Sequence, residues 1–183
     1  MISREEAINL LHKYLSNDRN LKHCLAVEAI MRALARRLGE DEVLWGLVGL
    51  LHDIDYELVG RDLSRHGLVA AELLRGLLPS DALDAIGAHN ELTGKALDTK
   101  LAYALKASDH ISGLIIATAL VMPNKRLSEV KAETVIKKFR QKDFAKGVNR
   151  DKVLLCGKLG LSLEEFVEVS LNALKEVSSE LGL

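Results

Sequence analysis

The stretch Gly49-Leu50-Leu51-His52-Asp53-Ile54-Asp55 carries a histidine and an aspartate directly after an apolar run. The run begins at Val43, and its composition predicts a buried helix. Burying an ionised carboxylate is costly unless it is paired or bound to a metal. Neighbouring residues on a helix point about 100° apart, so His52 and Asp53 can reach one centre only near a helix end or when the centre is broad. A two-metal site with a bridging carboxylate meets this condition.

Apolar residues elsewhere recur at intervals of three and four, which is typical of amphipathic helices. Ser3 with Glu6 and Ser162 with Glu165 have the spacing of capping boxes, and Gly39 has that of a helix stop. Only two prolines occur and no hairpin signal is present. We therefore predict an all-α fold. The expected helices span residues 4–16, 21–37, 41–52, 64–77, 80–89, 99–121, 128–139, 150–159 and 163–179.

Length and composition are those of one ordinary domain. The chain has 183 residues, 48% of them hydrophobic and 28% charged, and a formal net charge of -1. This charge argues against a binder of nucleic-acid polymers. The longest apolar stretch, Ile111 to Met122, is shorter than the roughly 20 residues of a membrane span, and the N-terminus lacks a signal-peptide pattern. Because Cys24 and Cys156 form no paired motif, we expect a single cytoplasmic domain without a membrane partner.

Four further side chains with metal-binding chemistry lie on other predicted helices: His23, His66, His89 and Asp109. Each has an ordinary alternative when it is considered alone. His23, His66 and His89 could be surface or capped histidines, and Asp109 could be paired with a neighbouring base. The order along the chain is more informative, since a histidine is followed by the His-Asp pair, two more histidines and an aspartate.

This ordered set resembles the HD superfamily of metal-dependent phosphohydrolases, in particular the branch in which two extra histidines support a second metal. The local context is similar at Leu-Leu-His-Asp 50–53, at His66-Gly67 and at Ala-Ser-Asp-His-Ile-Ser-Gly 107–113. The resemblance covers roughly residues 20–120. It implies a single-domain HD-type helical bundle over residues 1–183, with accessory C-terminal helices over 121–183.

The resemblance also implies a ligand set for one or two divalent transition-metal ions. One ion would be held by His23, His52, Asp53 and Asp109. The second would be held by His66 and His89, with Asp53 bridging. Mixed imidazole and carboxylate ligation suits Fe, Mn, Co, Ni or Zn. A hydroxide activated by such ions would attack the phosphorus of a substrate, and Asp53 is thereby a predicted catalytic residue.

The same chemistry needs cations for the remaining phosphate charge. Arg65, Lys95 and Lys106 are the nearest to the presumed ligands in sequence and are predicted to bind substrate, although each could be an ordinary surface charge. Asp55 is the second predicted catalytic residue, because it could orient water or protonate the leaving oxygen; with Glu57, it could equally solvate the loop. Tyr56 stands where some HD enzymes have Lys or Glu, so no specific general acid is transferred.

The roles of three further features of the sequence are left open. His110 could support Asp109 or pack between helices, and His12 is expected at the surface. The segment 137–152 carries seven Lys or Arg residues, which form either a solvated face or a rim that attracts phosphate. The apolar stripe from Leu163 to Leu174 could be core or the face of a homodimer.

The predicted function is hydrolysis of a phosphate ester or anhydride, on a nucleotide or a small phosphorylated metabolite; whether the enzyme would be a phosphomonoesterase or a phosphodiesterase stays open. Two alternatives remain. An HD-type di-iron oxygenase could use the same ligands, and a non-catalytic nucleotide-binding regulatory module could keep the fold.

Overall fold

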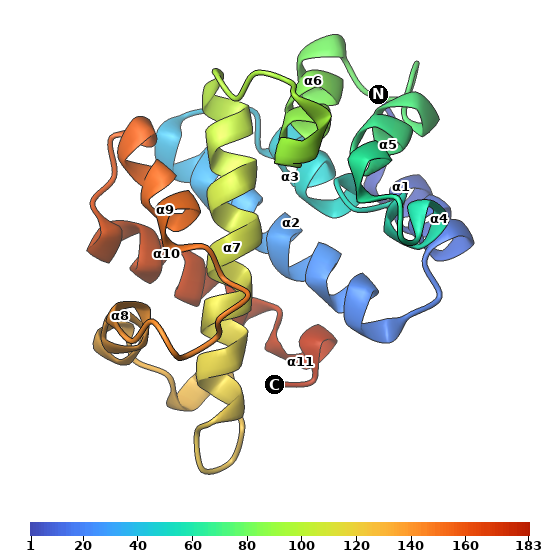
Figure 1. Cartoon of the computed structure of the whole chain (residues 1–183). Helices are drawn as coiled ribbons and strands as arrows, with labels where there is room; N and C mark the ends of the chain where they lie inside the picture. Colours follow the sequence, from blue (N-terminus) through green and yellow to red (C-terminus); the bar gives the residue numbers. More distant parts are fainter.

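Helices and short 3-10 turns build the whole chain, and the computed structural model describes residues 1–183 without a β-strand (Figure 1). The α-helices are α1 Arg4–Tyr14, α2 Asp18–Leu38, α3 Glu42–Leu51, α4 Tyr56–Val59, α5 Leu68–Leu73, α6 Ser80–Ala88, α7 Lys100–Leu120, α8 Ala132–Arg140, α9 Arg150–Val153, α10 Leu163–Glu176 and α11 Ser178–Leu181. The 3-10 turns are η1 Leu63–Arg65, η2 Glu91–Thr93, η3 Leu127–Glu129 and η4 Leu154–Leu159. The all-α prediction is confirmed.

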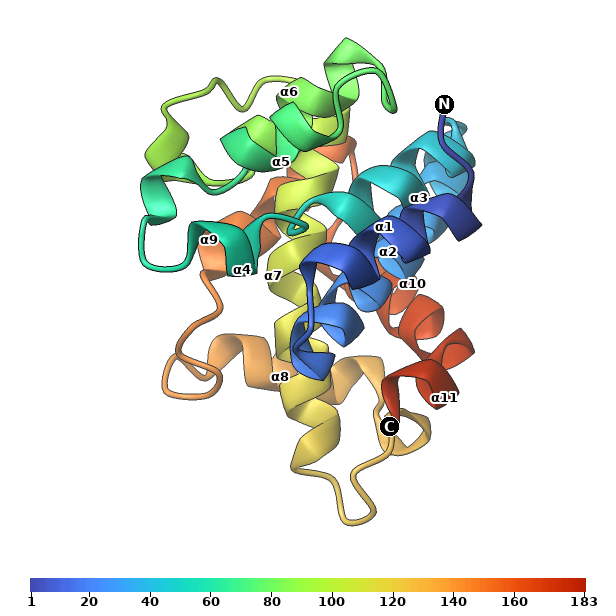
Figure 2. The same ribbon diagram turned by 90° about the vertical axis from the view of Figure 1, so that its right-hand side faces the viewer.

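Two 21-residue helices, α2 and α7, organise the bundle. In Figure 1, and again in Figure 2 after a quarter turn, α7 runs through most of the height of the molecule, and α2 packs against α3, α7, α10 and α11. The contact with α3 is close at Gly49, where an added Cβ would lie 2.9 Å from the backbone oxygen of Val27. A glycine is therefore needed at this point for α3 to approach α2, and this approach brings His52 and Asp53 over α2.

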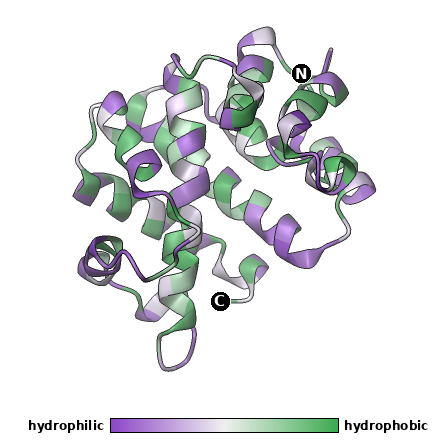
Figure 3. Ribbon diagram, in the orientation of Figure 1, coloured by the Kyte–Doolittle hydropathy of each residue, from purple (hydrophilic) through white to green (hydrophobic).

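One continuous hydrophobic core extends from α1 to α11. Helices α8 to α11 add Val135, Phe166, Leu174 and Leu181 to it, all less than 5% exposed. The apolar stripe of α10 therefore faces the core of its own chain. Hydrophilic and hydrophobic residues alternate along α7 and other helices, as amphipathic packing requires (Figure 3). The division into one domain with accessory C-terminal helices stays a prediction, and the shared core supports it.

The signals at helix ends are confirmed where they were specific. Ser3 with Glu6 and Ser162 with Glu165 form capping boxes at α1 and α10, and Gly39 ends α2 in the left-handed conformation. No helix combines the length and the apolar content that crossing a lipid bilayer requires.

The expected helix over 64–77 is wrong at both ends, because only its middle part, Leu68–Leu73, is α-helical. Residues 63–65 form η1, His66 is extended, and α5 begins only at Leu68. The break is at Gly67, which has φ of +89° and packs so closely that a Cβ would lie 2.9 Å from the Ile86 oxygen. This backbone favours glycine and directs the His66 side chain inward.

Smaller differences concern the remaining boundaries. The expected 150–159 helix is α9 followed by η4, and the 163–179 helix breaks at Val177 between α10 and α11. The helix expected from residue 128 starts at Ala132, and the single turn α4 had no counterpart among the expected helices.

Candidate metal centre

Helix α3 ends directly before His52 and Asp53, as the sequence predicted for two neighbouring residues that face one centre. The helix stops at Leu51, His52 occupies the C-terminal cap, and Asp53 lies in the turn that leads to α4. His52 and Asp53 can therefore face the same centre although they are neighbours in sequence. His89 caps α6 in the same way, while His23 and Asp109 project from within α2 and α7.

The Asp53 carboxylate lies between two groups of side chains. The Nε2 atoms on one side all lie 3.2 Å from Oδ1, and they belong to His52, His66 and His89. Oδ2 lies 3.6 Å from Nε2 of His23, which in turn lies 3.2 Å from Oδ1 of Asp109. The structure thus brings together all six residues predicted to bind metal.

Three of the imidazole rings are oriented through their Nδ1 atoms. Nδ1 of His52 lies 2.8 Å from the Gly49 oxygen, and Nδ1 of His89 lies 2.5 Å from the Ile86 oxygen. Because a carbonyl oxygen only accepts, both Nδ1 atoms donate, and in the neutral ring Nε2 then carries a lone pair. Metal-ligating histidines are commonly oriented by such contacts.

Asp55 orients the third ring. The Asp55 side chain is fully buried; its Oδ1 accepts from Nδ1 of His66 at 2.8 Å, and its Oδ2 accepts from the backbone of Gly67 and Ala70 at 2.8 and 2.9 Å. Both oxygens are therefore occupied by donors of the chain itself. These contacts favour a positioning role for Asp55 over the predicted catalytic role.

The arrangement requires positive charge at its centre. Nε2 atoms of His66 and His89 face each other at 3.0 Å, and Nε2 of His52 is buried without a hydrogen-bond partner. Nitrogen lone pairs at this separation repel unless a proton or a metal ion lies between them. Two sets of three side chains could each hold an ion, because the ligand atoms within each set lie within 4.8 Å of one another. One set is His23, His52 and Asp109, and the other is His52, Asp53 and His89. These donors fit a divalent transition metal.

The pKa values of His66, Asp53 and His52 are shifted by burial and by the charges of the cluster. Burial acts to lower the pKa of His66, but hydrogen bonds to Asp53 and Asp55 outweigh it and raise the pKa to about 9. Burial acts to raise the pKa of Asp53, yet the surrounding imidazoles, His52 first, hold it well below its usual range. Burial lowers the pKa of His52 to about 4. Without metal, an imidazolium at His66 supplies the charge that a metal ion would supply.

The three cations predicted to bind substrate lie in different surroundings. Lys106 is 7% exposed and donates to the backbone oxygen of His89, and burial lowers the pKa of its ammonium. Lys95 forms an exposed ion pair with Asp84 at 2.7 Å, and Arg65 is exposed and makes no ion pair. The structure brings Lys106 alone of the three against a candidate ligand.

Two supporting residues went unrecognised or were misassigned in the sequence. Asn90 donates to the backbone oxygens of Leu63 and His66 at 2.6 and 2.9 Å, and so holds η1 against the end of α6. Glu57 accepts from Ser16, Asn17 and Asn20, which ties α4 to the loop before α2 and to the start of α2. These hydrogen bonds, from the backbone of Ser16 first, lower the pKa of Glu57 to about 2. Only the position of Asn90 directly after His89 could have suggested its role.

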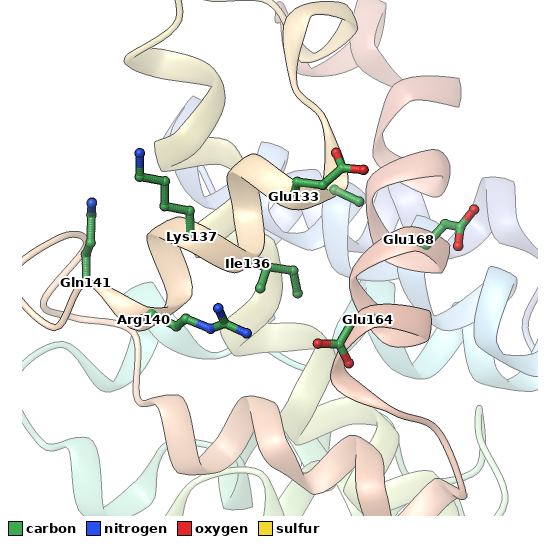
Figure 4. A pocket seen from close by; sticks show the side chains of 8 residues that line it. Glu133, Ile136, Lys137, Arg140, Gln141, Glu164 and Glu168 are labelled. Carbon is green, nitrogen blue, oxygen red and sulfur yellow. The ribbon is translucent and has the colours of Figure 1, made fainter.

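A cavity lies away from these residues, between α8 and α10 (Figure 4). It has a volume of about 750 Å³. Its charged lining residues are Glu133, Lys137, Arg140, Glu164 and Glu168. Arg140 points toward Glu164 across the cavity, and Ile136 lies between them. None of the six ligand candidates lines this cavity.

Comparison with known proteins supports the grouping that the six residues suggest. The family model described as "HD domain" matches residues 20–117, more than half of the chain. No curated protein and no solved structure gives a significant match. The fold and the centre define a helical protein of the kind that holds divalent metal. The chain belongs to the HD domain family, whose members are generally metal-dependent hydrolases.

Proposed function

We propose that the protein is a metal-dependent phosphohydrolase acting on a phosphate ester or anhydride, within a nucleotide or another small phosphorylated metabolite. The observation that carries the proposal is the surrounding of Asp53: four imidazole Nε2 atoms and the Asp109 carboxylate lie around one carboxylate that is only 17% exposed. Such a set of donors is costly to bury without cations.

The residues that would hold the metal are those of the predicted set. His23, His52, Asp53 and Asp109 would hold one divalent ion, and His66 and His89, with Asp53 between, would hold a second. Such ions lower the pKa of water toward neutrality and offset the charge on a phosphate group. The mixed nitrogen and oxygen donors favour Mn, Fe, Co, Ni or Zn.

The protein's own groups would perform three tasks around these ions. Asp55 holds the ring of His66 with Nε2 directed at Asp53. Carbonyl oxygens of Gly49 and Ile86 hold the rings of His52 and His89. Lys106 would contribute positive charge toward a phosphate oxygen, since it donates only one observed hydrogen bond and an ammonium has three protons to donate.

The test is turnover of a panel of phosphomonoesters, phosphodiesters and nucleotides without oxygen. Metal-free protein is loaded with Mn²⁺ or with Fe²⁺, and product release is compared with that of Asp53→Ala, with His12→Ala as a matched exposed control. Anaerobic hydrolysis abolished by Asp53→Ala supports the proposal. Iron-dependent oxygen consumption would instead indicate the di-iron oxygenase, and tight nucleotide binding without product would indicate the regulatory module.

The remaining expectations belong to the same proposal. The substrate would be a small molecule, without a nucleic-acid polymer or a membrane as partner. A cytoplasmic location is supported by the two cysteines, which are free and buried. A homodimer stays possible only through surfaces other than the apolar face of α10, because Phe166, Leu171 and Leu174 of that face are buried in the chain's own core.

A further inference from the structure

An ion pair joins the two parts of the chain beside the metal centre. Glu91 belongs to η2, two residues after His89, and its carboxylate pairs with the ammonium of Lys152 on α9. Lys152 lies outside the 20–117 segment that matches the HD domain family. The side chain of Lys152 is 26% exposed and that of Glu91 is 59% exposed. The C-terminal part of the chain thereby reaches the loop that carries a candidate ligand.

A second ammonium lies at the same loop. Lys106 on α7 donates to the backbone oxygen of His89, and the charges of Glu91 and Lys152 both act on it. Nδ1 of His110 accepts from the backbone of Asn149 at 3.4 Å, so α7 and the start of α9 are in contact here. Glu91 pairs with Lys152, and among the charged groups Asp109 acts most strongly on Lys106, followed by Glu91. Two ammonium groups, those of Lys106 and Lys152, thus lie at the loop that contains His89 and Glu91.

The backbone position of Lys152 does not depend on Glu91. Arg150, two residues earlier, donates to the backbone oxygens of Ala145 and Val148 at 2.8 Å each. Its other amino group donates to Gln141 and Phe144. These hydrogen bonds tie α9 to the preceding loop and to the end of α8. The backbone of α9 at Lys152 is therefore held by contacts that do not involve Glu91.

We propose that Lys152 is a phosphate-binding residue beside the metal centre, and that Glu91 pairs with it until an anionic group of the substrate displaces the carboxylate. The inference rests on the proposed function and extends substrate binding to the C-terminal helices. Exposed ion pairs are weak, whereas a phosphate group offers more negative charge and several acceptor oxygens. The exchange replaces one carboxylate by one phosphate at Lys152 and breaks no covalent bond.

The proposal assigns one of the seven basic residues in segment 137–152, Lys152, to the surroundings of the metal centre. Lys137 and Arg140 line the cavity between α8 and α10, and Lys146 pairs with Asp143 at 3.6 Å. Lys138 lies over the ring of Phe144. Lys152 is the member of this segment that pairs with the loop after His89, and the broader basic rim stays a prediction.

The test measures binding of inorganic phosphate to the metal-loaded protein by calorimetry, together with KM and kcat for any substrate found. We expect Lys152→Ala to weaken phosphate binding and to raise KM by about 10-fold or more, with little change in kcat. Glu91→Gln should strengthen phosphate binding by about 3-fold, the size of a surface ion pair. Lys152→Arg keeps the charge and should retain most of the binding.

Lys146→Ala is the matched control, because Lys146 is an exposed lysine of the same segment with a carboxylate partner. Metal content is measured in every variant. Phosphate affinity in Lys152→Ala equal to that in Lys146→Ala would overturn the inference, as would weaker binding in Glu91→Gln. If no phosphate ester is hydrolysed but phosphate binding still depends on Lys152, the proposed function fails and this inference stands. If hydrolysis occurs and phosphate binding ignores Lys152, the inference alone fails.

Discussion

The cluster around Asp53 and the cavity between α8 and α10 both contain charged side chains, but these side chains are stabilised in different ways. In the cavity, residues such as Lys137, Arg140 and Glu164 are exposed, so water can hydrate each of them and no partner is required. Around Asp53, His52 is fully buried and His89 is 3% exposed. There the charge must be balanced by other groups or by a bound ion.

The difference teaches that volume is a poor guide to chemistry in this protein. The cavity of about 750 Å³ contains no buried polar atom without a partner, whereas Nε2 of His52 is such an atom. An uncompensated buried polar group costs free energy in the folded state. At the cluster, a bound metal ion of the kind proposed above would offset that cost.

The largest expected effect is the loss of Asp53, which stands between both groups of imidazoles. Asp53→Ala should abolish metal binding and turnover, a loss beyond the roughly 10–100-fold typical of changes to residues that only orient ligands. Metal content by mass spectrometry and product release measure it. His12→Ala, at an exposed position of α1, should behave as the wild type. Full activity in Asp53→Ala would remove the cluster from the mechanism.

The removal of His66 separates the two sides of the cluster. His66→Ala should lower the metal content from about two ions per chain to about one, because the proposed second ion would lose one of its two histidines while His23 and Asp109 remain. Mass spectrometry on the purified variant reads this directly. A wild-type content of a single ion, unchanged in the variant, would mean that the cluster holds one ion without His66.

Asp55→Asn tests the positioning of His66 without replacing a proposed metal ligand. An amide keeps the shape but offers one acceptor oxygen in place of two, so either the ring of His66 or the backbone donors of Gly67 and Ala70 lose a partner. We expect a loss of roughly 10–100-fold in metal affinity or activity and about 1–3 kcal/mol in stability. Metal titration and thermal unfolding measure the two effects. Unchanged metal affinity would contradict the positioning role.

Proton and metal should compete at His66. Its pKa is raised from 6.5 to about 9 in the metal-free protein, so the proton there stabilises the fold fully below pH 6.5 and this contribution is lost as pH rises through 9. Metal must displace that proton, so metal affinity should fall about 10-fold per pH unit below 9 through this group. Thermal unfolding between pH 6.5 and 9 should show falling stability without metal and a growing metal-induced increase. Parallel curves with and without metal would contradict this linkage.

The smallest effect is expected at the cavity. Arg140→Ala removes a side chain that points toward Glu164, and hydrated surface charges contribute about 0–1 kcal/mol. Metal content and kcat/KM should change by less than about 2-fold. A large loss of turnover would show that the cavity takes part in the reaction and would reverse the comparison made above.

The six ligand candidates could be found in the sequence because their order and residue types are informative without coordinates. The helix end after Leu51 could be anticipated as well, since a buried His-Asp pair needs one. The role of Asp55 could not, because its partners Gly67 and Ala70 come together only through the positive φ at Gly67. An apolar pattern that continues through 64–77 hides such a break.

Contacts between distant segments could not be predicted from the sequence either. The pair of Glu91 with Lys152 joins residues that no periodicity relates, and the sequence could offer only a basic segment as a whole. Lys95 and Arg65 show the converse: proximity in sequence to a ligand does not bring a side chain to the centre, since the Lys95 ammonium pairs with Asp84.

The order of the ligand candidates along the chain has a consequence for biosynthesis. Chains leave the ribosome N-terminus first, at about 5–20 residues per second, so Asp53, His66 and His89 emerge before Asp109 on α7. A cation present during that interval meets the five residues from His23 to His89 without Asp109, whereas the finished protein offers all six at once. Metal captured during translation and metal supplied after purification therefore encounter different ligand sets, and the two preparations need not carry the same ions.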